Sequence, residues 1–241
     1  MEIGDAYGAM ITAFHEGGEV VEIIERDDGY IAASRFGPKI YFTPLRNWFK
    51  NERAAIRFAR GRVLDVGAGA GRVALHLEQR GQSVVAIDNS PGAVDVMRRR
   101  GVRDARLIAI EDIGPDLGTF DSVVMFGNNL GLLGGRAKGR RLLRRFHELT
   151  PDRGRIVASS LRVYDTDDPV HLAVHDRNRR RGRMGGQLRL RVRFGLLASP
   201  WLEYLMLPPE ELAELAEPTG WGIARVLDGD GPLYSVVLEK L

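Results

Sequence analysis

Three glycines at alternate positions follow a short apolar run that contains an acidic residue. The run is Val63-Leu-Asp65-Val66, and the glycines are Gly67, Gly69 and Gly71. Glycines spaced in this way let the backbone pass very close to a ligand, and the helix that follows directs its N–H groups toward it. Asp65 requires a positive or hydrogen-donating group on that ligand. Because a carboxylate here would repel a pyrophosphate, the pattern disfavours nicotinamide and flavin cofactors.

Further acidic side chains follow the next two apolar runs. Asp88 comes directly after Ser83–Ile87 and 21 positions after Gly67, where a carboxylate can hold both hydroxyls of a ribose. Glu111 and Asp112 follow the next run, where an acid can accept a hydrogen bond from an adenine amino group. Together with a cationic moiety at Asp65, these features favour S-adenosylmethionine (SAM), which has an ammonium, a sulfonium, a ribose and an adenine but no phosphate.

Two groups of side chains are candidates for the chemistry of a second substrate. Asn128 and Asn129 follow the run Asp121–Phe126, and they either orient a substrate or satisfy backbone groups in a turn. His171 and His175 stand four positions apart after Asp168-Pro169, a helix start, so they could face the same way. One of them is a candidate general base, because the free pKa of histidine is near neutrality. The alternative is that both lie on the surface.

Aromatic and basic residues mark the segment between residues 162 and 207. Tyr164, Trp201 and Tyr204 either wall a substrate pocket or pack this segment onto the rest of the chain. The densest run of charge comprises Arg177, Arg179, Arg180, Arg181 and Arg183. It is either a solvated helix end or a site for an acidic substrate, since the guanidinium fork suits bidentate pairing. Arg177 is the candidate substrate contact in this run.

Short apolar runs alternate with amphipathic stretches from about residue 60 to 161. This alternation predicts a mostly parallel sheet with helices on both faces. Strands are predicted over Val63–Val66, Ser83–Ile87, Ala105–Ile110, Asp121–Phe126 and Arg155–Leu161. Helices are predicted over Val73–Arg80, from Pro91 to about Arg100 behind a Ser90 N-cap, and over Ala137–Leu149.

The flanking segments have a different pattern. A hairpin is predicted across Asp28-Gly29, and an aromatic, basic helix around Arg46–Arg60. Gln187–Phe194 alternates arginine with apolar residues and predicts a half-buried strand, to which Trp201–Leu207 returns antiparallel. As an edge strand, Leu188–Phe194 is a candidate for pairing two copies of the chain into a homodimer. A helix over Glu210–Glu217 and strands over Trp221–Leu227 and Leu233–Glu239 close the chain.

Bulk composition narrows the classes of protein. The chain has 241 residues, no cysteine and a formal net charge of +3, so thiol nucleophiles, disulfides and thiolate metal sites are excluded. It has no apolar run long enough to span a membrane and no signal-peptide pattern at its start, which predicts a cytoplasmic protein. We expect neither a nucleic-acid partner, because polyanion binding needs a clustered basic patch, nor a metal site.

Taken together, these residues resemble the class I SAM-dependent methyltransferases. The resemblance covers residues 60–161 well and 208–241 loosely. It is carried by Asp65-Val-Gly67-Ala68-Gly69-Ala-Gly71, Ala86-Ile-Asp88-Asn89-Ser-Pro91, Glu111-Asp112-Ile113 and Phe120-Asp121-Ser-Val-Val. Leu149-Thr-Pro-Asp-Arg-Gly-Arg-Ile156 is similar to that family's turn into its fifth strand, although Asp152-Arg153 interrupts the usual Pro-Gly-Gly.

The resemblance implies a role for each matching residue. Gly67, Ala68, Gly69 and Gly71 would line the methionine part of SAM, and Asp65 would hold its amino group. Asp88 would bind the ribose, with Asn89 beside it. Asp112 and Ile113 would frame the adenine, with Glu111 as the alternative acid, and Gly127 and Asn128 would border the methyl-transfer chamber. Gly127-Asn-Asn-Leu130 lacks the prolines of the family's amine-methylating branches, which disfavours direct methylation of a nucleobase amine.

The expected fold is α/β, with a Rossmann-like seven-stranded, mostly parallel sheet and an inserted hairpin and helix as a substrate cap. The expected ranges, within one continuous domain, are 1–60 for an N-terminal cap, 61–161 for the SAM-binding core, 162–207 for the insertion and 208–241 for the closing elements. The expected activity is methyl transfer to a small molecule, with S-adenosylhomocysteine (SAH) as the product. The alternatives are an RNA or protein methyltransferase that docks through residues 177–193, and a non-catalytic SAM-binding subunit or sensor.

Overall fold

A computed structural model describes residues 1–34 and 36–241. Contacts between residues divide the chain into two compact units, each drawn from several segments. The first unit comprises Met1–Trp48, Asp65–Asp112 and Arg189–Leu202. The second comprises Phe49–Leu64, Ile113–Leu188 and Glu203–Leu241. The ranges expected from the sequence stay predictions.

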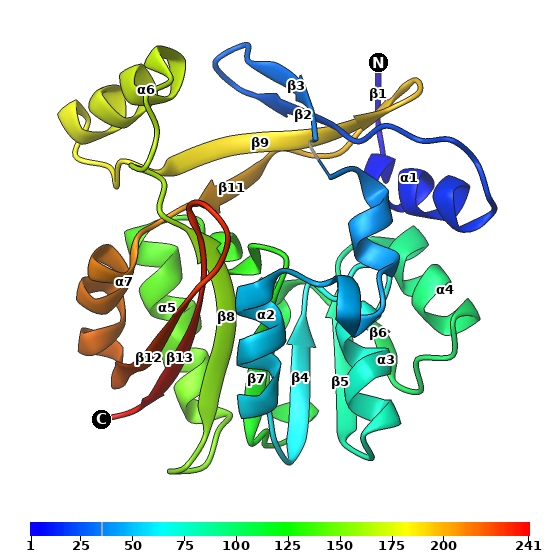
Figure 1. Cartoon of the computed structure of the whole chain (residues 1–241), viewed down its shortest axis with the longest axis vertical. Coiled ribbons are helices and arrows are strands. Elements are labelled where there is room, and N and C mark those ends of the chain that lie inside the picture. Colours follow the sequence, from blue (N-terminus) through cyan, green and yellow to red (C-terminus); the bar gives the residue numbers. More distant parts are fainter. Residues whose placement is uncertain (35) are drawn as a thin grey trace. The chain divides into compact units, whose positions relative to one another are not determined.

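The larger sheet has seven strands in the order β12-β13-β8-β7-β4-β5-β6 (Figure 1). These strands are β4 (Arg62–Val66), β5 (Ser83–Asp88), β6 (Ala105–Leu107), β7 (Ser122–Met125), β8 (Arg155–Leu161), β12 (Trp221–Asp228) and β13 (Leu233–Lys240). β5 and β6 pair in parallel, as do β7 and β8, whereas β13 runs antiparallel to both β8 and β12. The predicted α/β fold with a mostly parallel sheet is confirmed.

Helices of ordinary amphipathic character accompany this sheet. They are α2 (Lys50–Ala55), α3 (Arg72–Gln79), α4 (Pro91–Arg99), α5 (Arg136–Glu148) and α7 (Pro209–Ala216). α4 begins where the sequence predicted, because the Ser90 hydroxyl accepts a hydrogen bond from the Ala93 N–H and Pro91 occupies the first helical position. α5 buries Leu142, Leu143 and Phe146, the apolar stripe that predicted it.

A second sheet has the strand order β1-β10-β9-β2-β3, with β11 paired to β9. Its strands are β1 (Glu2–Ile3), β2 (Ile23–Arg26), β3 (Ile31–Ala33), β9 (Gln187–Phe194), β10 (Leu197–Ala198) and β11 (Leu202–Leu205). The predicted hairpin is confirmed by the antiparallel pairing of β2 and β3. The prediction that Leu188–Phe194 is an edge strand is wrong, because β2 and β10 occupy both sides of β9.

Two helical segments differ from the prediction. The helix expected around Arg46–Arg60 is only α2, flanked by short 3-10 turns, because Trp48 and Phe49 are extended, with ψ near 161° and 146°. In the first unit, α1 (Ala6–His15) was not predicted; Asp5 caps it by accepting from the Gly8 N–H. The 3-10 helices are η1 (Pro38–Phe42), η2 (Leu45–Asn47), η3 (Ile56–Phe58), η4 (Ile110–Asp112), η5 (Pro115–Leu117), η6 (Asn129–Leu133) and η7 (Glu217–Thr219).

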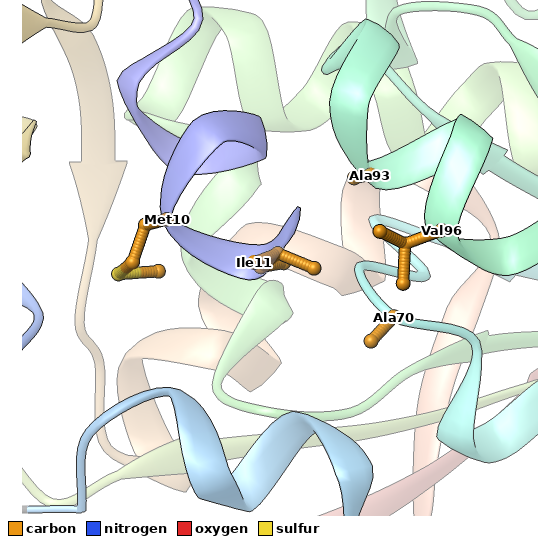
Figure 2. Packing of buried hydrophobic residues seen from close by; sticks show 5 residues of the cluster. All are labelled: Met10, Ile11, Ala70, Ala93 and Val96. Atoms are coloured by element: carbon orange, nitrogen blue, oxygen red, sulfur yellow. The ribbon is translucent and has the colours of Figure 1, made fainter. Parts of the chain in front are cut away.

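A hydrophobic cluster of the first unit joins α1, α4 and the glycine loop (Figure 2). Its buried members are Met10, Ile11, Ala70, Ala93 and Val96. The cluster fixes the glycine loop against two helices, so it supports the conformation of the loop directly. In the second unit, α6 (Pro169–Arg180) begins at an Asp168 cap followed by proline, the start that the sequence indicated.

Within residues 1–34 and 36–241, no helix is both long enough and apolar enough to cross a membrane.

Candidate functional site

The glycine loop connects β4 to α3. Gly67, Gly69 and Gly71 have φ values of 66°, 57° and 78°, in a region that glycine adopts without the steric cost of a side chain. A side-chain carbon added at Gly71 would lie 2.7 Å from Val102, and one at Gly69 would lie 2.8 Å from the Tyr7 hydroxyl. Glycine is therefore required here for both the backbone conformation and the close packing.

Asp65 is a buried carboxylate in β4, only 2% exposed. Burial raises its pKa to about 7, although the nearby Arg72 guanidinium and a hydrogen bond from the Ala74 backbone N–H act in the opposite direction. Within residues 1–34 and 36–241, no group is hydrogen-bonded to its Oδ2. A buried carboxylate oxygen without a donor is costly, and the ammonium group of an amino-acid ligand would supply one. This carboxylate therefore fits the cationic end of SAM.

Asp88 ends β5 beside the glycine loop and is also buried. Its carboxylate accepts hydrogen bonds from the backbone N–H groups of Gly69 (2.9 Å) and Ser90 (3.0 Å). Burial raises its pKa, and these hydrogen bonds partly offset the rise. Ala68 donates its N–H to the Ile87 carbonyl at 3.0 Å, which further ties the loop to β5. Asp88 thus holds the loop, and each carboxylate oxygen keeps acceptor capacity for a ribose hydroxyl.

The N-terminal helix α1 contributes to the same site, although the sequence did not indicate it. The Asp5 carboxylate accepts from the Gly8 and Gly92 N–H groups, each at 2.8 Å, and from the Ser90 hydroxyl at 2.8 Å. A side-chain carbon at Gly92 would lie 2.7 Å from the Gly8 Cα, so α1 and α4 are in close contact (Figure 1). The contact places Tyr7 against the glycine loop. The one local feature that could have indicated α1 is the capping residue Asp5 before Ala6, and no amphipathic pattern follows it.

The remaining residues expected to bind SAM lie in both units. Glu111 and Asp112 are exposed in η4 of the first unit, as is Asn89 after β5. Ile113 is buried in the second unit. Their roles toward the adenine and the ribose stay predictions.

Asn128 occupies an unusual turn after β7 in the second unit. Its φ is 65°, the only positive φ of a non-glycine residue in the described part of the chain. The Asn128 N–H donates to the Ser159 hydroxyl at 3.0 Å, and its carbonyl accepts from the Tyr204 hydroxyl at 2.5 Å. The preceding Gly127 N–H donates to the Glu52 carboxylate at 2.7 Å. Asn129 begins η6 directly after this turn.

His171 and His175, four positions apart in α6, differ in how deeply they are buried. His171 is partly exposed, and its Nε2 lies 3.5 Å from the Asp168 carboxylate. His175 is buried, and its ring lies edge-on to Tyr164, with 5.2 Å between ring centroids. The reason is that the inward face of α6 is centred on Val174, His175 and Asn178, which leaves His171 at its margin.

Tyr164 is engaged within the second unit. Its hydroxyl donates to the Glu211 carboxylate, and the Arg179 guanidinium lies 4.5 Å from the centroid of its ring. Burial and the Glu211 carboxylate raise the Tyr164 pKa to about 12. These contacts join Tyr164 to α6 and α7, and its part in binding a substrate stays a prediction.

The two other candidate substrate contacts belong to different units. Trp201, in the first unit, has the Arg191 and Arg189 guanidinium groups at 4.4 Å and 5.5 Å from its ring centroid. Arg177, in the second unit, is exposed on α6. It lines a cavity of about 380 Å³ together with Ala173, Asp176, Arg180 and Arg181. Substrate binding by Trp201 and by Arg177 stays a prediction.

The chain is similar over nearly its whole length to a solved enzyme. This is a SAM-dependent methyltransferase from Bacteroides fragilis in complex with SAH, at 26% identity and a TM-score of 0.83, covering 98% of this chain and 94% of that one. Residues 63–154 match a family described as a methyltransferase domain. That match includes Asp65, the glycine loop and Asp88.

Two curated proteins are also similar to the chain, one over most of its length and one over a shorter segment. The probable non-canonical nonribosomal peptide synthetase CymA of Salinispora arenicola is 29% identical over 226 residues, which cover 88% of this chain and 3% of that protein. The ubiquinone biosynthesis O-methyltransferase of Methylocella silvestris is 38% identical over 68 residues, which cover 26% of this chain and 27% of that protein. The chain therefore spans only a small part of the length of these curated relatives.

Three findings point to the same kind of protein. They are the mostly parallel sheet, the glycine loop with its two buried carboxylates, and the similarity to the enzyme from Bacteroides fragilis. Residues 63–154 therefore form a methyltransferase domain, and the chain has the fold of the class I SAM-dependent methyltransferases.

Proposed function

We propose that this protein transfers a methyl group from SAM to a small-molecule acceptor. The single observation that carries the proposal is the similarity of almost the whole chain to the SAH-bound methyltransferase of Bacteroides fragilis. The local similarity to an enzyme named for O-methylation in ubiquinone biosynthesis supports a small acceptor with a hydroxyl group.

The residues present fit the cofactor. Asp65 would hold the ammonium of SAM, because its carboxylate is buried and its Oδ2 lacks a donor among the described residues. Asp88 would hold the ribose, and the loop glycines, which adopt positive φ without the steric cost of a side chain, would let the backbone approach the methionine part. Bound SAM supplies a methyl group activated by the sulfonium. The protein has to align the acceptor with that group, and alignment supplies much of the rate enhancement.

On the acceptor side, we assign the orienting role to Asn128. Its turn is fixed by hydrogen bonds to both of its backbone polar groups, whereas the His175 ring is buried in contact with Tyr164. The proton that an acceptor hydroxyl loses during methylation would pass to water. Since the sulfur is a good leaving group, correct orientation contributes more to this reaction than a strong base does.

The proposal is tested by measuring SAH formation from SAM with simple acceptors. Catechol and benzylamine serve as hydroxyl and amine probes, and an Asp88→Ala variant serves as the control. We expect SAH to form with at least one probe in the wild-type protein and to fall strongly in the variant. No SAH above the level of the variant with either probe would contradict transfer to small hydroxyl or amine acceptors.

A macromolecular acceptor is the second candidate. It is favoured by the cavity on α6, where Arg177, Arg180 and Arg181 lie close together. Such a cationic surface suits a polyanion, whose binding weakens steeply as salt rises. Binding of a fluorescent RNA that falls by orders of magnitude between low and physiological salt, and that depends on Arg180, would favour this candidate over the first.

A further inference from the structure

We propose that Glu52, Ser159 and Tyr204 form a positioning frame that fixes Asn128 for contact with the methyl acceptor. The inference rests on the proposed function, which assigns the acceptor to Asn128. None of the three frame residues has a pattern in the sequence that indicates such a role. They come from α2, β8 and β11, which lie far apart along the chain.

The backbone conformation of Asn128 is the first observation. A φ of 65° is disfavoured for any residue with a side chain, although asparagine tolerates it better than most. Such conformations persist where the surroundings over-determine them, and they concentrate at sites of function. The conformation therefore requires contacts that hold it.

The frame supplies these contacts. Glu52 is 1% exposed, and its Oε1 accepts from both the Gly127 N–H at 2.7 Å and the Ser159 hydroxyl at 2.9 Å. The Ser159 oxygen in turn accepts from the Asn128 N–H at 3.0 Å, and the Tyr204 hydroxyl donates to the Asn128 carbonyl. Three consecutive peptide groups are thus anchored by three side chains.

The Tyr204 ring is itself held in place. A side-chain carbon at Gly131 would collide with the Tyr204 ring, so ring and backbone are in direct contact. Replacing Tyr204 with phenylalanine would keep this packing and remove only the hydrogen bond to Asn128. The role of the hydroxyl can therefore be tested separately from the role of the ring.

With its backbone groups occupied by the frame, Asn128 has only its carboxamide to offer a ligand. Its Oδ1 is buried and has no hydrogen-bond partner among residues 1–34 and 36–241. A buried acceptor without a donor is costly, and the hydroxyl or amine of a methyl acceptor carries the missing donor. The frame therefore selects acceptors that donate a hydrogen bond and orients the group that is methylated.

The test is a double-mutant cycle on kcat with Tyr204→Phe and Asn128→Ala. Catechol and benzylamine are the probes, and calorimetry with SAH measures the cofactor site separately. We expect Tyr204→Phe to lower kcat about tenfold, as for one lost hydrogen bond. We expect Asn128→Ala to lower it about 100-fold, as for a misaligned acceptor, with SAH affinity unchanged in both. In the double variant we expect no loss beyond that of Asn128→Ala alone.

A matched control is Tyr234→Phe, which removes another hydroxyl that donates to a backbone carbonyl, that of Leu207, at 2.7 Å. We expect this variant to lose stability but keep its kcat. Additive losses in the cycle, or a kcat for Tyr204→Phe equal to that of the control, would overturn the positioning role. If the wild-type protein turns over neither probe, the proposed function fails, and the inference falls with it; SAH binding then shows whether the cofactor site itself is intact.

Discussion

The affinity for SAH should depend on pH through Asp65. Burial raises the pKa of this carboxyl to about 7, so below that pH the site is mostly neutral. The cationic ammonium of SAH binds the ionised carboxylate better, and binding at low pH must therefore release the Asp65 proton. The affinity for SAH therefore rises as pH increases toward and through 7. The stability of the free protein changes in the opposite direction, because its folded state favours the protonated acid.

The size of the effect follows from the ionised fraction. For a pKa of about 7, roughly 3% of Asp65 is ionised at about pH 5.5 and roughly 76% at about pH 7.5. The Kd for SAH should therefore fall about 25-fold over this interval. The free protein loses stability as pH rises from 3.8, the ordinary pKa of the carboxyl, to about 7. Over that range the free energy of unfolding falls by an amount on the order of 4 kcal/mol.

The assay is isothermal titration calorimetry of SAH across this range, in buffers of different ionisation enthalpy that report proton release. Adenosine is the matched control ligand, because it has the ribose and adenine but no ammonium. The affinity of the wild-type protein for adenosine should lack the contribution of Asp65 and should change little with pH. The affinity of an Asp65→Asn variant for SAH should likewise change little with pH. A change of less than threefold for the wild-type protein, or the full slope retained in Asp65→Asn, would refute the reasoning.

Three further predictions concern the structure around the site. Gly92→Ala should destabilise the fold by about 2 kcal/mol, because its new carbon lies 2.7 Å from the Gly8 Cα. The control Gly81→Ala should cost only about 1 kcal/mol, because Gly81 has a φ of 81° but open space around it. Equal losses of stability in urea unfolding would contradict the close contact between α1 and α4. Asp88→Ala should lower SAH affinity at least about tenfold by removing a charged acceptor, measured by calorimetry, and unchanged affinity would remove the ribose assignment. Burial raises the pKa of Glu22 above its usual 4.5. The wild-type protein should therefore lose stability relative to Glu22→Gln as pH rises above 4.5. If the free energies of urea unfolding of the two proteins change in parallel with pH, this prediction is wrong.

The sheet and its first helices were predictable because local patterns there agree with the tertiary structure. The apolar run before Asp88 is strand β5. Ser90 and Pro91 start α4 in both prediction and structure, since a cap and a first-turn proline act locally. The glycine loop was predictable for the same reason, because alternate glycines between an apolar run and an amphipathic stretch mark a turn from a strand into a helix, and each of the three has a positive φ in the structure.

The N-terminal helix was not predictable in this way. α1 buries Ala6, Gly8, Met10 and Ile11, so it lacks the clear polar and apolar faces that mark an amphipathic helix. Gly8 also has poor helix propensity, yet a side-chain carbon at this position would collide with the Asp5 carboxylate and the Ser90 hydroxyl. Tertiary packing therefore outweighed local propensity.

The contacts of Asn128 could not be predicted from the sequence for a related reason. The sequence offered a turn after the strand as one of two alternatives for Asn128, but Glu52, Ser159 and Tyr204 meet there only because the chain is folded. Similarly, the alternation in Gln187–Phe194 predicted a strand correctly, but no local pattern could show that β2 would pair with it and remove its free edge.

The central claim is that the glycine loop, Asp65 and Asp88 form a site for SAM, and equilibrium binding tests it most directly. SAH and NAD should be titrated separately into the wild-type protein near pH 7.5. We expect SAH to bind with a Kd in the micromolar range, to be weakened strongly by Asp88→Ala, and NAD not to bind measurably. Binding of NAD in preference to SAH, or no binding of SAH at high micromolar concentration, would contradict the claim.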